Sequence, residues 1–179
     1  ADLLAFCERA KNESYITVDT EFVREHTYWS HLCLIQVGLE HEAVAIDPLA
    51  NGIDLSSFFE LLQNPHVVKV FHSARQDLEI FYHLTGKIPE PLFDTQVAAM
   101  VCGFGESIGY TILAEKYAKV TLDKSSRYTD WAQRPLTDKQ LQYALGDVIY
   151  LRPIYEKLLK IIKDGDRLHW LKEEVSILT

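Results

Sequence analysis

The sequence predicts an α/β fold in which helices flank a mixed β-sheet. Three β-type runs separated by turn-sized gaps open the pattern, and a helix, a buried strand and a second helix follow them. The first three strands suit an antiparallel meander, and the β-β-β-α-β-α order implies a mixed sheet with helices packed on it. The chain has 179 residues and 47% apolar content, which fits one compact domain with a sizeable core.

Alternation of apolar residues and the position of turn residues locate the strands. Asp47-Pro48 and Asn51-Gly52 end the meander, and Asn64-Pro65 precedes the buried strand. The expected strands are Tyr15–Val23, His31–Leu39, Glu42–Asp47 and Val67–Phe71.

Helical periodicity and capping residues locate the helices. Thr137 and Gln140 form a capping box at the start of the longest helix, and Pro153 predicts a kink or break in it. Asp94 is expected to be a helix N-cap. The expected helices are Asp54–Gln63, Ser73–Leu84, Asp94–Cys102, Tyr110–Lys119, Thr137–Ile162 and one around Arg167–Val175, with a long loop at Thr121–Pro135.

The charge balance limits the ways in which this protein can bind nucleic acid. Asp and Glu number 26 against 18 Lys and Arg, which gives a formal net charge of −8. Binding to phosphates by bulk electrostatics is therefore unexpected. A phosphate-bearing substrate would need a local positive source, and a divalent metal held by carboxylates would provide one. The alternative is that the negative charge simply maintains solubility.

The sequence indicates a soluble, cytoplasmic protein without a membrane partner. No apolar run approaches the roughly 20 residues that cross a bilayer, and the first residues lack the pattern of a signal peptide. The three cysteines are odd in number and too widely spaced for CxxC chemistry, which favours reduced thiols.

Two carboxylates share one face of the first expected strand. Asp19 and Glu21 are two residues apart and point together, opposite the face of Ile16, Val18 and Phe22. They would repel each other. A solvated acidic face and a functional site are both open interpretations of this pair.

Asp77 lies on the inward stripe of the expected helix Ser73–Leu84, together with Ala74, Ile80 and Phe81. An isolated buried carboxylate is unfavourable, so a cation or a hydrogen-bond partner is expected beside it. The alternative is an aspartate that caps a neighbouring backbone.

Tyr143 and Asp147 are four residues apart and therefore lie on one face of the longest helix, at the margin of its apolar stripe. They can act on one ligand, although such a pair is also common as a plain helix-surface contact.

These acidic residues have the chemistry of a magnesium or manganese site. Both ions prefer oxygen ligands, usually a few carboxylates completed by water and substrate phosphate. Two such ions about 4 Å apart can activate a water and stabilise the leaving 3′-oxygen. The seven histidines form no HxxxH or Cys/His pattern, so the sequence offers no zinc alternative.

The same motifs resemble a known family over nearly the whole chain. Asp19-Thr20-Glu21, HSARQDLEIF with Asp77, and the Tyr143–Asp147 segment YALGD are similar to the three motifs of the DEDD superfamily of 3′→5′ exonucleases, in its tyrosine branch. The histidine branch would place a histidine where Gln142 stands. DTEFVREHTYWSHLCLIQV, PLFDTQVAAM and LDKSSRYTDWAQRPLTDKQLQYALGDVIYL resemble bacterial ribonucleases D in particular.

This resemblance implies a ribonuclease H-like fold and the release of nucleoside 5′-monophosphates from RNA 3′ ends with two Mg²⁺ or Mn²⁺ ions. Asp19, Glu21 and Asp147 would hold the metal that activates the water. Asp19 would bridge to a second metal, which Asp77 would support. Tyr143 would position the attacking water, because a phenol with an ordinary pKa of roughly 10 is a poor base at neutral pH.

Several residues are candidates for substrate contacts. Phe22 could wedge against the terminal base, although a core position is favoured for it, and His72 could donate to a phosphate or satisfy a backbone carbonyl. Lys124, Arg127 and Arg134 form a basic patch in the long loop, where they could steer the 3′ end or pair with neighbouring aspartates.

The resemblance also sets expectations for domains and substrates. Residues 1–164 are expected to form the exonuclease domain, and the helix in 165–179 would begin a linker to helical domains that this chain lacks. Single-stranded RNA 3′ ends are the expected partner, with tRNA precursors as a family-level expectation. DNA or very short oligonucleotides are alternative substrates, and a non-catalytic RNA-binding protein is an alternative from another class. The sequence does not determine the oligomeric state.

Overall fold

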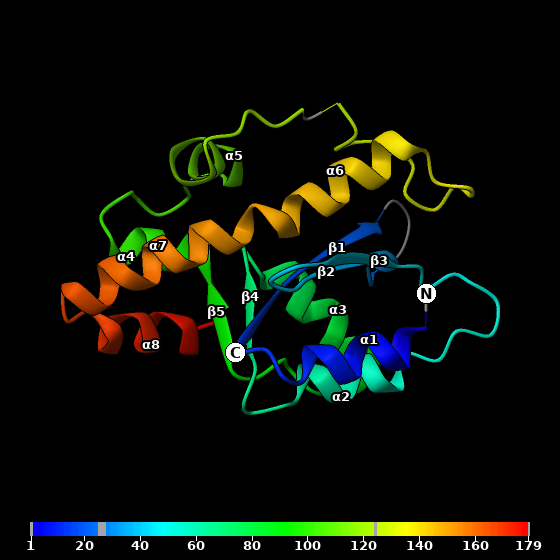
Figure 1. Ribbon diagram of the computed structural model, residues 1–179, viewed down its shortest axis with the longest axis horizontal. Coiled ribbons are helices and arrows are strands. Elements are labelled where there is room, and N and C mark those ends of the chain that lie inside the picture. Colours follow the sequence, from blue (N-terminus) through cyan, green and yellow to red (C-terminus); the bar gives the residue numbers. More distant parts are fainter. Residues whose placement is uncertain (1, 25–27, 124, 179) are drawn as a thin grey trace.

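A five-stranded mixed sheet forms the centre of the computed structural model, which describes residues 2–24, 28–123 and 125–178 (Figure 1). The strand order is β3-β2-β1-β4-β5, with β1 antiparallel to β2, β2 antiparallel to β3, and β4 parallel to both β1 and β5. The predicted meander and mixed sheet are thereby confirmed. The strands are β1 Tyr15–Val23, β2 His31–Gly38, β3 Ala43–Ile46, β4 Val68–Phe71 and β5 Leu92–Asp94.

Helices cover both faces of the sheet (Figure 1). The first three lie on one face, and the later ones lie on the other. None of the described helices is long and apolar enough to cross a membrane. Their bounds are α1 Leu3–Ala10, α2 Ser56–Leu62, α3 Arg75–Thr85, α4 Thr95–Val101, α5 Tyr110–Leu113 continued by a π-helical turn Ala114–Ala118, α6 Asp138–Ile149, α7 Leu151–Asp164 and α8 Leu168–Ser176.

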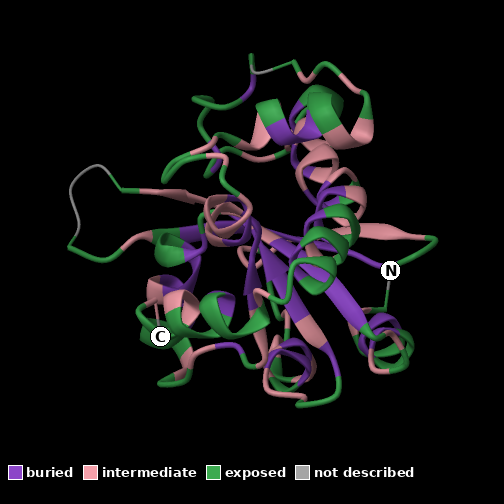
Figure 2. Cartoon of the chain, turned by 90° about the vertical axis from the view of Figure 1, so that its left-hand side faces the viewer, coloured by how far each residue is buried: buried purple, intermediate pink, exposed green. Residues whose placement is uncertain are grey.

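The two larger hydrophobic cores lie on opposite faces of the sheet, and buried strands separate them (Figure 2). The first core joins α1, α2 and α3 to the face of β1 that carries Ile16 and Val18. The second core packs α4, α5 and α7 against Tyr15 and β4. Helix α8 adds to the second core through Leu171, which is buried.

Two short elements were absent from the sequence prediction. Helix α1 begins after Asp2, whose carboxylate accepts hydrogen bonds from the backbone N–H groups of Leu4 and Ala5. This N-cap is readable in the sequence. Strand β5 has three residues, too few to show alternation, and exists because it pairs with β4.

The longest predicted helix is broken into α6 and α7 at Tyr150. Pro153 lacks the N–H that would bond to the carbonyl of Ile149, and its ring crowds that carbonyl, so the break falls before the proline. The predicted break is confirmed, and so is the capping box of Thr137 and Gln140.

Candidate active site

One face of β1 presents its side chains to α6. The Thr17 hydroxyl donates a hydrogen bond of 2.8 Å to the backbone carbonyl of Val148, which fixes the direction of this row. Asp19 and Glu21 alternate with buried Val18 and therefore belong to the same row. The side chains of both carboxylates therefore lie on the face of β1 that packs against α6, as the alternation of the strand predicts.

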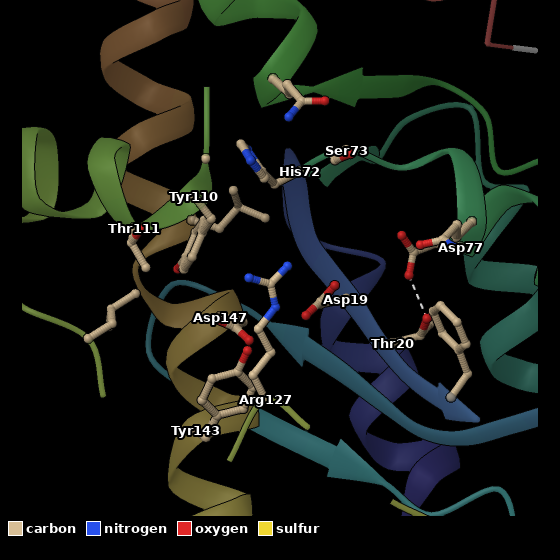
Figure 3. Close-up of a pocket in the computed structure, with 16 residues that line it drawn as sticks. Asp19, Thr20, His72, Ser73, Asp77, Tyr110, Thr111, Arg127, Tyr143 and Asp147 are labelled. Atoms are coloured by element: carbon tan, nitrogen blue, oxygen red, sulfur yellow. Dashed lines mark hydrogen bonds between the residues drawn. The ribbon is translucent and has the colours of Figure 1, made fainter. Parts of the chain in front are cut away.

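Helix α6 adds a third carboxylate to this pair. Oxygen atoms of Asp19, Glu21 and Asp147 all lie within 4.8 Å of one another. Asp147 and Tyr143 point toward Asp19 from α6 (Figure 3). Segments that are far apart in the sequence therefore converge on one point, and each offers oxygen ligands.

Burial raises the pKa values of all three carboxylates, and neighbouring carboxylate charges raise those of Asp19 and Glu21 further. Burial and the Asp147 charge hold the pKa of Asp19 well above its usual range. Burial, with the charges of Asp19 and Asp147, raises the pKa of Glu21 to about 10, and burial raises that of Asp147 to about 7. The cluster is short of positive charge. An oxygen-only donor set with this deficit fits a hard divalent cation such as Mg²⁺ or Mn²⁺.

Asp77 approaches the cluster from the opposite side of β1. It is 6% exposed in the first turn of α3 and accepts a short hydrogen bond from the Thr20 hydroxyl. Burial and the nearby Asp19 charge hold its pKa well above the usual range. Asp19 lies between Asp77 on one side and Asp147 on the other (Figure 3). Asp77 is thus a neighbour of the cluster and a candidate to share a second cation with Asp19.

Tyr143 is a hydrogen-bond donor to the cluster. Its phenol bonds to the Asp147 carboxylate, and its ring packs against Trp131 at a centroid distance of 6.0 Å. Burial and the surrounding carboxylates raise the pKa of Tyr143 above its ordinary value. The phenol is therefore protonated at neutral pH, which suits a group that orients water and argues against a general base.

A pocket of about 360 Å³ opens beside the carboxylates (Figure 3). This volume is in the range of small-molecule sites and is adequate for one nucleotide. Asp19, Asp77 and Asp147 form its acidic part. One polar wall is lined by His72, Ser73, Gln76, Gln96, Tyr110 and Thr111, and Phe22, Leu122 and Leu151 add apolar surface to the pocket.

Asp94 organises this polar wall. Its carboxylate accepts hydrogen bonds from the backbone N–H groups of Ser73 at 3.1 Å, Ala74 at 2.8 Å and Gln96 at 2.7 Å. Ser73 has a φ of 59°, a conformation that these bonds help to hold. The predicted N-cap role of Asp94 is confirmed. Asp94 also connects the start of α3 to α4. The sequence does not reveal this second role, because it depends on the parallel pairing of β4 with β5.

Two hydroxyl groups fix the part of α6 that carries Asp147. Tyr110 donates to the Gly146 carbonyl at 2.9 Å, and Thr17 donates to the Val148 carbonyl. These carbonyls flank Asp147 in the sequence. A Cβ atom at Gly38 would lie 2.4 Å from the Thr17 hydroxyl oxygen and 3.1 Å from the Val148 carbonyl oxygen, so glycine permits β2 to lie close to α6. Sequence reasoning missed both hydroxyls, although a glycine within a strand is a signal of close backbone approach.

The predicted substrate residues Phe22, His72 and Arg127 line the pocket. Phe22 also packs against the first core, as the favoured interpretation expects, and its contact with a terminal base stays a prediction. One ring nitrogen of His72 pairs with the Thr95 hydroxyl at 2.9 Å, and burial lowers the pKa of His72, which leaves the ring neutral. Arg127 reaches toward Asp19 and Asp147 (Figure 3).

Arg134 has a different role from the predicted one. Its guanidinium makes an ion pair with Asp47 through contacts of 2.7 and 2.8 Å. It also donates to the backbone carbonyls of Cys33, Trp131 and Gln133. These bonds occupy its five N–H groups and fasten the loop to the sheet, which argues against the predicted substrate contact. Lys124 lies outside the described residues.

Sheet order, carboxylate cluster and pocket together are those of an exonuclease core with a ribonuclease H-like fold. The model of the 3′-5′ exonuclease family matches residues 1–163, and the chain belongs to this family.

Within the family, the chain is similar to ribonuclease D. The ribonuclease D of Jannaschia sp. (strain CCS1) is 57% identical over 182 residues, which cover 99% of this chain and 47% of the relative. That of Bartonella henselae is 52% identical over 168 residues, with coverage of 94% and 41%.

Solved structures agree with this assignment. Escherichia coli RNase D, described as an exoribonuclease involved in structured RNA processing, matches with a TM-score of 0.94 at 40% identity, covering 98% of this chain and 47% of that chain. The catalytic core of RRP6 from Trypanosoma brucei matches with a TM-score of 0.90 at 26% identity, covering 98% and 48%. The chain therefore spans about half the length of these four relatives.

Proposed function

We propose that this chain is the catalytic part of a 3′→5′ exoribonuclease of the ribonuclease D type, which releases nucleoside 5′-monophosphates from RNA 3′ ends. The observation that carries the proposal is the convergence of Asp19, Glu21 and Asp147 within 4.8 Å beside a nucleotide-sized pocket. Residues 1–164 are the exonuclease domain in this proposal. In the same proposal, helix α8 packs on this domain through Leu171, and residues 165–179 would begin a linker.

The carboxylates fit two divalent ions, Mg²⁺ or Mn²⁺. Asp19, Glu21 and Asp147 would hold one ion, and Asp19 with Asp77 would hold the other. The chemistry that such ions supply is acidification of the attacking water and neutralisation of charge on the phosphate. Hard oxygen ligands and the raised pKa values of all four carboxylates support this assignment.

The protein's own groups orient the reactants. The Tyr143 phenol stays protonated and offers its oxygen as an acceptor beside Asp147, so that it aligns the attacking water without removing its proton. Arg127 approaches the carboxylates from the long loop and brings positive charge to the entry of the pocket, where it can attract the scissile phosphate. In this proposal Lys124 contributes to the same steering.

The pocket wall would hold the terminal nucleotide. Phe22 offers an aromatic surface next to Thr20 and Asp77, and stacking on such a surface is tolerant of base identity. His72 is neutral and held by Thr95, so it presents a hydrogen-bonding edge without adding a charge. A pocket for one nucleotide fits removal of residues one at a time.

Single-stranded RNA 3′ ends are the proposed substrate, and precursors of tRNA in the cytoplasm are the proposed physiological source. The support comes from 40% identity to a protein described as acting in structured RNA processing. RNA and DNA share the phosphate on which the metal site would act, so DNA and short oligonucleotides belong in the same test.

A time course on matched 5′-labelled single-stranded RNA and DNA, with Mg²⁺, Mn²⁺ or EDTA, tests the proposal. We expect a metal-dependent ladder that shortens RNA from its 3′ end and is absent with Asp19→Asn. Faster shortening of DNA would reassign the substrate. Binding of RNA without any shortening, in either metal, would instead support a non-catalytic RNA-binding role.

A further inference from the structure

Gln36 is a buried polar residue that the proposed mechanism leaves unused. Its side chain is 0% exposed, in the middle of β2. Neither its amide nitrogen nor its amide oxygen has a hydrogen-bond partner among the described residues. Because buried amides in folded proteins are almost always paired, such a group calls for a physical reason.

The strand register places Gln36 against the carboxylate cluster. Gln36 is the direct cross-strand partner of Asp19 on β1. Side chains at directly opposed positions share one face of a sheet, with Cβ atoms about 4.5–5.5 Å apart. The Gln36 amide therefore lies on the side of the sheet that carries Asp19 and Glu21.

The neighbours of Gln36 along β2 show that α6 covers it. Leu34, two residues before it, packs in one cluster with Ala144 of α6. Gly38, two residues after it, lies below the carbonyl of Val148, 3.1 Å from where its Cβ would be. Gln36 thus sits under the turn of α6 that carries Asp147, enclosed between that turn and Asp19.

Few acceptors at this position remain for the amide. The Gly146 and Val148 carbonyls already accept from Tyr110 and Thr17. The carboxylates of the cluster retain free lone pairs, and an ionised carboxylate is a strong acceptor for an N–H group. A neutral amide also adds no charge that would compete with a cation.

We infer that Gln36 is a positioning residue of the metal site, whose amide NH₂ donates to the Asp19 carboxylate when the cluster holds a divalent cation. This inference rests on the proposed function. Groups that bond to metal-ligating carboxylates fix their orientation, and their loss typically weakens metal affinity about 10–100-fold.

Calorimetric titration of the free protein with Mn²⁺ tests the inference without any nuclease assay. Gln36→Met keeps the length of the side chain and removes both polar groups, and Gln36→Leu provides a second apolar replacement. Gln63→Met is the matched control: the Gln63 amide is partly buried and donates to the Ile88 carbonyl at 3.1 Å, in a region bordering the first core.

We expect Gln36→Met to bind Mn²⁺ about tenfold or more weakly than wild type. In EDTA its midpoint of urea unfolding should equal or exceed that of wild type, because two unpaired buried groups are gone. Gln63→Met should show the reverse pattern, with lower stability and wild-type Mn²⁺ affinity.

Wild-type Mn²⁺ affinity in whichever Gln36 variant keeps the wild-type circular dichroism spectrum would overturn the inference. A wild-type protein that binds no Mn²⁺ would overturn the metal site itself, and with it the proposed function. The two failures are therefore distinguishable.

Discussion

The two faces of β1 have opposite physical characters. Ile16 and Val18 are fully buried in an apolar core on one face. On the other face, one residue along, Thr17, Asp19 and Glu21 meet α6 and bring carboxylates together. The first face stabilises the fold by about 1.5–3 kcal/mol for each large apolar side chain that it buries. The second face opposes folding whenever its carboxylates are ionised without a cation.

This difference indicates that one strand anchors the sheet and holds the site at the same time. The apolar face keeps β1 in a fixed position, so the carboxylates cannot move apart to relieve their repulsion. A site that stays assembled against repulsion is prepared for a cation before the cation arrives. Substitutions on the two faces should therefore have separable effects.

The largest expected effect comes from Asp19→Asn on the polar face. We expect hydrolysis of RNA to fall by about a thousandfold or more, the scale on which enzymes lose activity when a central catalytic group is removed. The measurement is kcat on 5′-labelled RNA in saturating Mg²⁺. Asp54→Asn is the control, because Asp54 is exposed and accepts a hydrogen bond from the Ser56 N–H at the start of α2. Equal losses in the two variants would contradict the assignment of the polar face.

The next effect concerns the apolar face. Ile16→Ala should lower the free energy of unfolding by about 2–5 kcal/mol, because it leaves a cavity in the first core. Mn²⁺ affinity of the folded variant should stay within about twofold of wild type, since the polar face keeps its groups. Urea unfolding and calorimetric titration measure the two quantities. A large loss of Mn²⁺ affinity with unchanged stability would show that the two faces of β1 do not have separate roles.

A smaller effect is expected at the edge of the polar face. Tyr143→Phe removes the phenol that bonds to Asp147 and should reduce kcat about 10–100-fold. The dependence of kcat on pH should keep its shape between pH 6 and 9 because the raised pKa of Tyr143 keeps the phenol protonated throughout this range. Loss of a limb of the pH profile in the variant would show that Tyr143 acts as a base.

The two arginines of the long loop extend the comparison beyond β1. Arg127 lines the pocket, whereas Arg134 is committed to Asp47. Arg127→Ala should raise KM for RNA roughly tenfold with little change in stability, as expected for loss of one charge-assisted contact to phosphate. Arg134→Ala should lower stability by about 1–2 kcal/mol and leave KM unchanged. A raised KM in Arg134→Ala, with lower stability in Arg127→Ala, would show that Arg134 is the residue that contacts the substrate.

Local chemistry explains which of these features the sequence reveals. Asp19 and Glu21 occupy alternate positions of one strand, so the sequence predicts that they point in the same direction. Tyr143 and Asp147 share one face of a helix, so the same holds for them. Arg134 looks identical to Arg127 in the sequence, because its partner Asp47 is distant along the chain and becomes a neighbour only when the loop folds onto β2 and β3. The second role of Asp94 is hidden for the same reason.

Gln36 illustrates a further limit. In the sequence it is a polar residue among the apolar residues that follow His31 in β2, and its role depends on the register that places it opposite Asp19. A shift of one residue would turn it to the other face. Register is decided by packing of the whole sheet, which is why this residue could be interpreted only from the structure.

The effects of pH and of metal on stability test whether the polar face of β1 is built around a divalent cation. The pKa values of Asp147 and Glu21 are raised in the folded protein to about 7 and about 10. Their contribution to stability is therefore present below about pH 4 and is lost as pH rises through these values. Metal-free protein should be less stable at pH 8 than at pH 5.

The measurement is urea unfolding of wild type and Asp19→Asn at pH 5 and pH 8, in EDTA and in Mn²⁺. At pH 8 we expect the variant to be the more stable protein in EDTA and wild type to be the more stable one in Mn²⁺. The same ranking in both solutions would contradict the claim that the polar face of β1 is built around a divalent cation.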